Sequence, residues 1–142
     1  MNPAPSPLGT VTVIADPLLR TTTLPLSPAN KVYAVLDAAH TCGSDILIWM
    51  DADTIVHNKM PLEFFENFIP NDVFLSYAGR GSKYTECGWY SMNLKHVYAL
   101  PFFNEFERMY EDADAGIFTL EEWHDSYVFD QVLKKIRIEH KK

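Results

Sequence analysis

Basic residues are scarce in this sequence. Its 142 residues include 12 Lys and Arg against 19 Asp and Glu, so the formal net charge at pH 7 is -7. Nucleic-acid-binding proteins need clustered Lys and Arg to neutralise phosphates. The one basic cluster here, residues 134–137 with Lys141 and Lys142, is what a helix dipole favours in the last turn. We therefore expect no nucleic-acid partner.

Cysteines and long apolar runs are also few. Cys42 and Cys87 fit neither a CxxC motif nor a disulfide framework, so we expect two buried thiols in a reducing compartment. No apolar run approaches the roughly 20 residues that span a bilayer. The first fifteen residues also lack the charged n-region and long apolar core of a signal peptide. We expect a cytoplasmic protein without a membrane span.

Hydrophobic residues, in contrast, make up 47% of the chain, which is enough for one packed core. Residues 1–26 are rich in proline and predict a tail or loop in which 10–15 can form a short strand. Residues 27–142 predict a single α/β domain. Its apolar spacing indicates helices at 28–42, 61–68, 97–110 and 125–136 and strands at 46–50, 73–77 and 87–93, with Asp125 as the N-cap of the last helix.

The central stretch is the apolar run 46–50 followed by Asp51-Ala52-Asp53. Such a run predicts a strand buried on both faces in the middle of a parallel or mixed sheet. In extended geometry Asp51 and Asp53 share a face, where they repel one another unless a cation lies between them. Because open α/β sheets bind ligands at this end of a strand, we expect Mg²⁺ or Mn²⁺ holding a phosphorylated substrate; the alternative is two solvated carboxylates in a turn.

A second motif surrounds Glu86 in the aromatic stretch 84–90. Glu86 is a candidate sugar-binding carboxylate or general base, because rings such as Trp89 stack on sugar faces while carboxylates accept hydrogen bonds from hydroxyls. Gly88 permits close approach of a ligand. The alternative is an aromatic core strand with a glutamate at its edge.

Two further pairs are candidates for binding phosphate. Arg80 and Lys83 lie in a glycine-bearing loop before the aromatic strand and can neutralise a phosphate, although loop cations are usually only solvated. His124 and Asp125 open the last predicted helix, whose amino terminus adds positive potential facing a bound diphosphate. Their alternative roles are surface packing for His124 and helix capping for Asp125.

Together these motifs resemble a known family. Residues 47–54 (LIWMDADT), 84–94 (YTECGWYSMNL) and 122–130 (EWHDSYVFD) look like the successive motifs of GT-A-fold nucleotide-sugar glycosyltransferases, in particular a group of bacterial and phage transferases. The similarity covers about residues 30–136. It implies an α/β, GT-A-like mixed sheet flanked by helices, which moves a sugar from a nucleotide-diphosphate donor to a hydroxyl acceptor.

The resemblance also implies roles for individual residues. Asp51 would lie toward the donor ribose, the sugar and the metal, Asp53 would bind the metal, and His124 would be a further metal ligand. Glu86 and Asp125 would be the catalytic carboxylates. Only 45 residues precede Ile46, fewer than in the half of a GT-A fold that grips the nucleoside, so we expect a fold that is incomplete in its amino-terminal half.

Two other interpretations remain open. Residues 51–54 also fit the Asp-x-Asp-x-Thr motif of haloacid-dehalogenase-like phosphatases, in which Asp51 would be the nucleophile and Asp53 the acid/base. That fold needs a later lysine and a second acidic pair, and neither is evident here. The other interpretation is a non-catalytic remnant or binding module of the transferase fold.

Overall fold

The computed structural model describes residues 11–15, 28–81 and 83–139. Most of the predicted tail therefore lies outside the described residues. Every helix and strand predicted within the described ranges is present, with ends that differ by up to three residues, and one short 3₁₀-helix was not predicted. In chain order the elements are β1 (Val11–Ala15), α1 (Pro28–Thr41), β2 (Ile46–Met50), α2 (Leu62–Phe68), β3 (Leu75–Ala78), β4 (Glu86–Asn93), α3 (Ala99–Glu111), the 3₁₀-helix η2 (Ile117–Thr119) and α4 (Asp125–Glu139).

The strands form one mixed sheet with the order β1-β2-β4-β3. β2 lies parallel to β1 and antiparallel to β4, and β4 is also antiparallel to β3. All five residues of β2 are buried, as expected for an interior strand. The expected mixed sheet with β2 in its interior is therefore confirmed.

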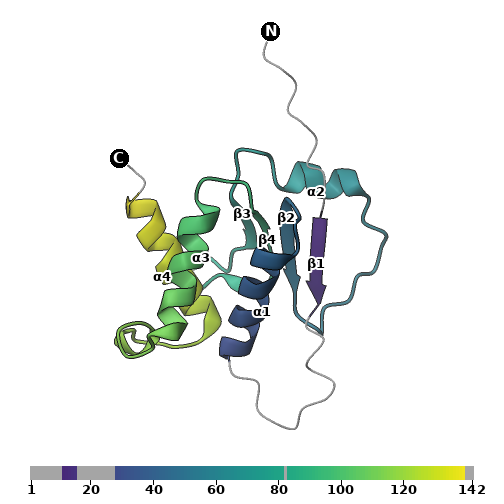
Figure 1. The fold of residues 1–142 in the computed structure, drawn as a ribbon. Coiled ribbons are helices and arrows are strands. Elements are labelled where there is room, and N and C mark those ends of the chain that lie inside the picture. Colours follow the sequence, from purple (N-terminus) through teal and green to yellow (C-terminus); the bar gives the residue numbers. More distant parts are fainter. Residues whose placement is uncertain (1–10, 16–27, 82, 140–142) are drawn as a thin grey trace.

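Three helices cover one face of this sheet. Leu47 and Trp49 of β2 stand opposite Met92 and Tyr90 of β4, and all four side chains belong to the main core. Buried residues of α1, α3 and α4 complete that core. Figure 1 shows these three helices together on one side of the strands, with α2 apart from them. The alternation along β2 and β4 therefore decides which side chains meet the helices.

The other face of the sheet carries a smaller cluster. Ile46, Ile48 and Met50 of β2 are buried there with Ile69, and Phe65 of α2 packs against them. Within the described ranges, no helix is long and apolar enough to cross a membrane.

Gly43 joins α1 to β2. The Cys42 N–H donates to the carbonyl of Ala38, 2.9 Å away, and Gly43 follows with φ of +63°, a conformation that favours glycine. The helix predicted over 28–42 is thus present and ends one residue earlier, at Thr41.

Candidate functional site

Asp51 and Asp53 lie in a turn at the carboxyl end of β2. The strand ends at Met50, and the Thr54 N–H donates to the Asp51 carbonyl, 2.9 Å away. Asp51 is half-buried, whereas Asp53 is exposed. The extended geometry that the sequence suggested for Asp53 is therefore wrong, because the turn replaces the alternation of a strand.

The counter-charge beside Asp51 is a lysine. The Lys31 ammonium of α1 lies 3.0 Å from Asp51 Oδ1 and 2.9 Å from Asp125 Oδ2, and it donates to the Cys87 carbonyl at 2.5 Å. The Trp49 indole N–H also donates to Asp51 Oδ1, at 2.7 Å. Lys31 thus joins the end of β2 to the start of α4.

The pKa of Lys31 reflects this position. Burial alone would lower its pKa, but the charges of Asp125 and Asp51 and their hydrogen bonds outweigh burial, and the pKa lies above the ordinary 10.5. Sequence analysis missed this residue because a lysine on an amphipathic helix is usually solvated. One signal was present: Lys31 precedes Val35 by four residues and therefore lies on the apolar side of the helix.

Gly88 brings a second carboxylate toward Asp51. A Cβ at Gly88 would lie 3.1 Å from Glu86 Oε1 and 3.2 Å from Asp51 Oδ2, so both oxygens converge on the space that glycine leaves open. The Gly88 N–H donates to Glu86 Oε1 at 3.0 Å, and its carbonyl accepts from the Asp51 N–H at 2.8 Å. Arg80 forms an ion pair with Glu86. A side chain at Gly88 would therefore require both carboxylates to shift by a few tenths of an ångström.

His124, rather than Asp125, caps α4. The helix begins at Asp125, and the Tyr127 N–H donates to His124 Nδ1 at 3.2 Å. The predicted N-cap at Asp125 is therefore wrong, because its Oδ1 accepts from the neighbouring Ser126 N–H at 2.9 Å and its Oδ2 faces Lys31. This arrangement leaves Asp125 directed toward the end of β2.

Both ring nitrogens of His124 are engaged. Nδ1 accepts the capping hydrogen bond, and Nε2 lies 2.8 Å from Glu122 Oε2. Since a neutral imidazole has one lone pair and one N–H, this pairing makes Nε2 the donor. Coordination of a metal by His124 would require one of these two bonds to break.

Tyr84 packs against this end of α4. Its ring centroid lies 4.8 Å from that of His124, and its hydroxyl donates to Glu122. The hydrogen bond to Glu122 raises the pKa of Tyr84 to about 12, and the same bond lowers the pKa of Glu122.

The structure thus gathers only some of the candidate residues. Asp51 and Asp125 share Lys31, and Asp51 also lies beside Gly88 and Glu86. Trp89 packs instead against the small cluster on the opposite face of the sheet. The remaining candidates are Asp53, Lys83, Arg80 and His124. Asp53 and Lys83 are exposed. Arg80 pairs with Glu86, and His124 pairs with Glu122.

No metal-ligand cluster accompanies these residues. In the part of the chain that the structure describes, no three His, Cys, Asp or Glu side chains are gathered so as to hold a metal ion. The counter-charge that sequence reasoning assigned to a metal ion is supplied, at Asp51, by Lys31.

The two cysteines differ in their surroundings. Both are free thiols, but Cys87 is buried and Cys42 is only half-buried, so the expectation of two buried thiols is wrong for Cys42. Burial raises the pKa of Cys87 to about 12.

Because the thiolate is the reactive form, we expect iodoacetamide at pH 8 to alkylate Cys42 and to spare Cys87. Mass spectrometry should find one adduct in the native protein and two in guanidinium; fast labelling of Cys87 in the native protein would contradict this.

Comparisons of the chain with protein-family models, with curated proteins and with solved structures found no match.

Proposed function

We propose that this protein is a glycosyltransferase of GT-A-like fold, which moves a sugar from a nucleotide-diphosphate donor to a hydroxyl acceptor with the help of a divalent metal ion. The observation that carries the proposal is that Asp51, just after β2, lies near Asp125 of α4 through Lys31 and near Glu86 of β4 across Gly88. They meet at the carboxyl end of β2, where open α/β sheets bind ligands. The mixed sheet with helices packed on it is compatible with the same fold.

Glu86 is the general base in this proposal. Its Oε1 lies beside Gly88, near Asp51 Oδ2, and accepts the Gly88 N–H at 3.0 Å, while a carboxylate has further lone pairs with which it can take a proton from an acceptor hydroxyl. A carboxylate removes a proton best from a group within hydrogen-bond reach. Arg80 neutralises Glu86 in this structure, so accepting a proton requires this ion pair to loosen.

Lys31 and Asp125 complete the electrostatics. Lys31 is held between two carboxylates, and this fixed ammonium would stabilise negative charge that develops on the departing diphosphate. Asp125 holds the ammonium in place and would orient the hydroxyls of the bound substrate. Lys83, which is exposed, would contribute further positive charge.

Asp51 and Asp53 are the residues that would hold the metal ion. Mg²⁺ and Mn²⁺ take oxygen ligands and commonly use one or two carboxylates with water and phosphate oxygens. Asp51 Oδ1 is taken by Lys31 and Trp49, which leaves Oδ2, and the Asp53 side chain is exposed. When bound, the cation supplies charge stabilisation to the diphosphate. His124 joins the ligand set only if it releases Tyr127 or Glu122.

Asp53→Asn tests the metal and donor site. We expect it to weaken Mn²⁺-dependent binding of nucleoside diphosphates by about tenfold or more, because one of two carboxylate ligands is lost. Isothermal titration of the wild type with UDP, GDP, ADP and CDP, each with and without Mn²⁺, identifies the base. Asp114→Asn is the matched control, since Asp114 is an exposed carboxylate in the turn after α3. Equal affinities of both variants would remove the metal from Asp53.

A phosphatase is the second candidate, and Lys31 is the observation that favours it. An ammonium 3.0 Å from Asp51 could stabilise a phosphoryl group on that carboxylate, a role that sequence reasoning sought in a later lysine. The nucleophilic oxygen would attack phosphorus, displace the alcohol and form an acyl phosphate, which water then hydrolyses. Incubation with p-nitrophenyl phosphate and Mg²⁺, followed by acid quench and mass spectrometry, would detect a phosphorylated Asp51. Absence of both phosphorylation and nucleotide binding would favour a non-catalytic remnant.

A further inference from the structure

β3 forms one edge of the sheet. It pairs with β4, and within the described ranges no strand lies on its other side. The Asn93 N–H of β4 donates to the carbonyl of Phe74, which directly precedes β3, at 2.8 Å. Because the residues of an antiparallel strand bond to their neighbour alternately, Ser76 also faces β4, whereas Leu75 and Tyr77 direct their backbone N–H and C=O groups away from it. The outer edge of β3 can therefore accept a further strand.

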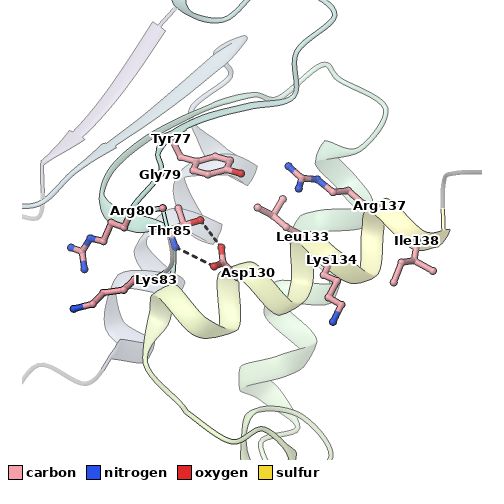
Figure 2. A pocket seen from close by; sticks show the side chains of 11 residues that line it. Tyr77, Gly79, Arg80, Lys83, Thr85, Asp130, Leu133, Lys134, Arg137 and Ile138 are labelled. Carbon is pink, nitrogen blue, oxygen red and sulfur yellow. Dashed lines mark hydrogen bonds between the residues drawn. The ribbon is translucent and has the colours of Figure 1, made fainter.

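Two cavities follow this edge, between β3 and α4. The larger has a volume of about 490 Å³, and its lining includes Tyr77, Leu133 and Arg137. Figure 2 shows these side chains. The smaller has a volume of about 200 Å³, and its lining includes Leu75 with the same Leu133 and Arg137. Since the two cavities share residues of α4, we describe them together as the β3–α4 groove.

Arg137 is the cation of the larger cavity. In Figure 2 the charged ends of Arg80 and Lys83 are directed away from α4. Lys134 extends from the side of that helix opposite Arg137. The Arg137 guanidinium, in contrast, is directed toward the side where the Tyr77 hydroxyl lies (Figure 2). A carboxylate that enters the larger cavity would thus find a guanidinium as its counter-charge.

The protein's own carboxylate in this cavity, Asp130, is engaged elsewhere. It accepts from the Thr85 N–H at 3.1 Å and from the Thr85 hydroxyl at 2.5 Å. Among the described residues, neither Asp130 nor another carboxylate forms an ion pair with Arg137. The guanidinium is therefore available to a ligand.

The smaller cavity is mainly apolar. Phe74 and Ile136, both buried, form part of its wall together with Leu75. Such a wall favours burial of an aliphatic side chain. Leu75 and Tyr77 are two positions apart on β3, and each lines one of the two cavities. This is the spacing of side chains on one face of a strand, so a strand added beside β3 can place one side chain in each cavity.

The open backbone groups distinguish a peptide from other ligands. A sugar or another small molecule can fill a cavity, but it does not pair with the N–H and C=O groups of Leu75 and Tyr77. An extended peptide does both, as in other cases of strand addition to a sheet edge. A second copy of the chain is a weaker candidate, because both copies carry a net charge of -7 and repel each other.

We propose that the β3–α4 groove binds an extended peptide segment of a partner protein, which adds to the outer edge of β3 as a further strand. Its backbone pairs with Leu75 and Tyr77. An acidic side chain enters the larger cavity and pairs with Arg137, and an apolar side chain two positions away enters the smaller cavity and packs on Phe74. The register shift after Tyr77 keeps the paired stretch short. The inference goes beyond the proposed transfer reaction and does not depend on it.

Amide hydrogen exchange of the free chain tests the open edge. In nuclear magnetic resonance spectra, the amides of Leu75 and Tyr77 should exchange at least about tenfold faster than that of Ser76, whose N–H faces β4. Equal protection of the three amides would mean that another segment or a second copy already covers the edge, and the proposal would fail.

A phage-displayed library of random peptides, selected on the full chain without nucleotide or metal, is the probe for the ligand. Selected sequences should carry Asp or Glu two positions from an apolar residue. Isothermal titration of the strongest synthetic peptide should give an affinity that Arg137→Gln weakens by about tenfold or more. The matched control is Lys135→Gln, which removes the same charge from the same helix outside the groove and should change the affinity by less than about twofold. Circular dichroism confirms that both variants are folded.

N-methylation of that peptide separates strand addition from simple filling of the cavities. Alternate N–H groups of an added strand face β3, so methyl groups on one set of alternate residues should weaken binding by about tenfold or more, and those on the other set by less than about threefold. The amides of Leu75 and Tyr77 should become protected from exchange when the peptide binds. Equal effects of the two sets, no enriched peptide, or equal affinities for the wild type and Arg137→Gln would overturn the proposal.

Discussion

Phe129→Ala is expected to destabilise the protein by about 3–5 kcal/mol, the usual range for removing a buried phenyl ring. Phe129 of α4 is 1% exposed. Its ring centroid lies 5.3 Å from those of Tyr90 and Phe102, 6.1 Å from that of Phe106 and 6.4 Å from that of Tyr77. The ring therefore joins α4 to α3 and to both β3 and β4, and alanine would leave a cavity where these elements meet.

Urea denaturation followed by circular dichroism measures this effect. The matched control is Phe118→Ala, because Phe118 is 52% exposed and, among the described residues, its one aromatic neighbour is Trp123, edge-on at 5.1 Å. The control should change the free energy of unfolding by less than about 1 kcal/mol, as surface substitutions usually do. Similar losses in the two variants would mean that α4 does not dock on the sheet in solution.

Local structure could be predicted from the sequence because each element has its own apolar period. The run 46–50 predicted β2, and the stripe Val128, Val132 and Ile136 predicted the buried side of α4. The pairing of the strands could not be predicted in the same way. A strand that is apolar along its whole length, such as β2, can pair with a parallel or an antiparallel neighbour. Its antiparallel pairing with β4 depends on contacts between residues far apart in sequence.

The site could be predicted only as a set of residue types. A metal shared by His124 and Asp53, as the resemblance implied, would place the start of the last helix near the end of β2. Asp125 does lie there, since its carboxylate shares Lys31 with Asp51. The cap at His124 in place of Asp125 was not predicted, because either side chain is able to accept the hydrogen bond. The role of Lys31 was not predicted, because helical spacing alone does not show which residues pack against a helix.

Lys31→Met should have the second largest effect, a loss of about 2 kcal/mol in the free energy of unfolding at pH 7. Methionine keeps most of the side-chain stem but leaves Asp51 and Asp125 without the cation between them. Breaking a fully buried ion pair costs about 3–5 kcal/mol. The expected loss is smaller here because the side chains of Asp51 and Asp125 are 39% and 25% exposed, so water screens the remaining charges.

The effect has a defined dependence on pH. The pKa of Lys31 is raised in the folded protein, so its stabilisation is fully present below pH 10.5 and is lost as the pH rises through the folded pKa. Wild type and Lys31→Met should therefore differ by a constant amount at neutral pH and converge above about pH 10.5. Cys87 contributes a separate alkaline loss in the wild type, between its ordinary pKa of 9.0 and about 12. The charge of Lys31 lowers the pKa of Cys87, so this loss extends to higher pH in Lys31→Met.

Two further variants separate the charge from the packing. Lys59→Met, in the exposed loop before α2, should change the free energy of unfolding by less than about 0.5 kcal/mol. Lys31→Met with Asp125→Asn should recover part of the stability lost in the single variant, because one of the two facing charges is gone. The two sites do not interact if Asp125→Asn lowers the free energy of unfolding of Lys31→Met by as much as it lowers that of the wild type. In that case Lys31 would stabilise the protein through its contact with Trp49 and the Cys87 carbonyl rather than by holding the two carboxylates together.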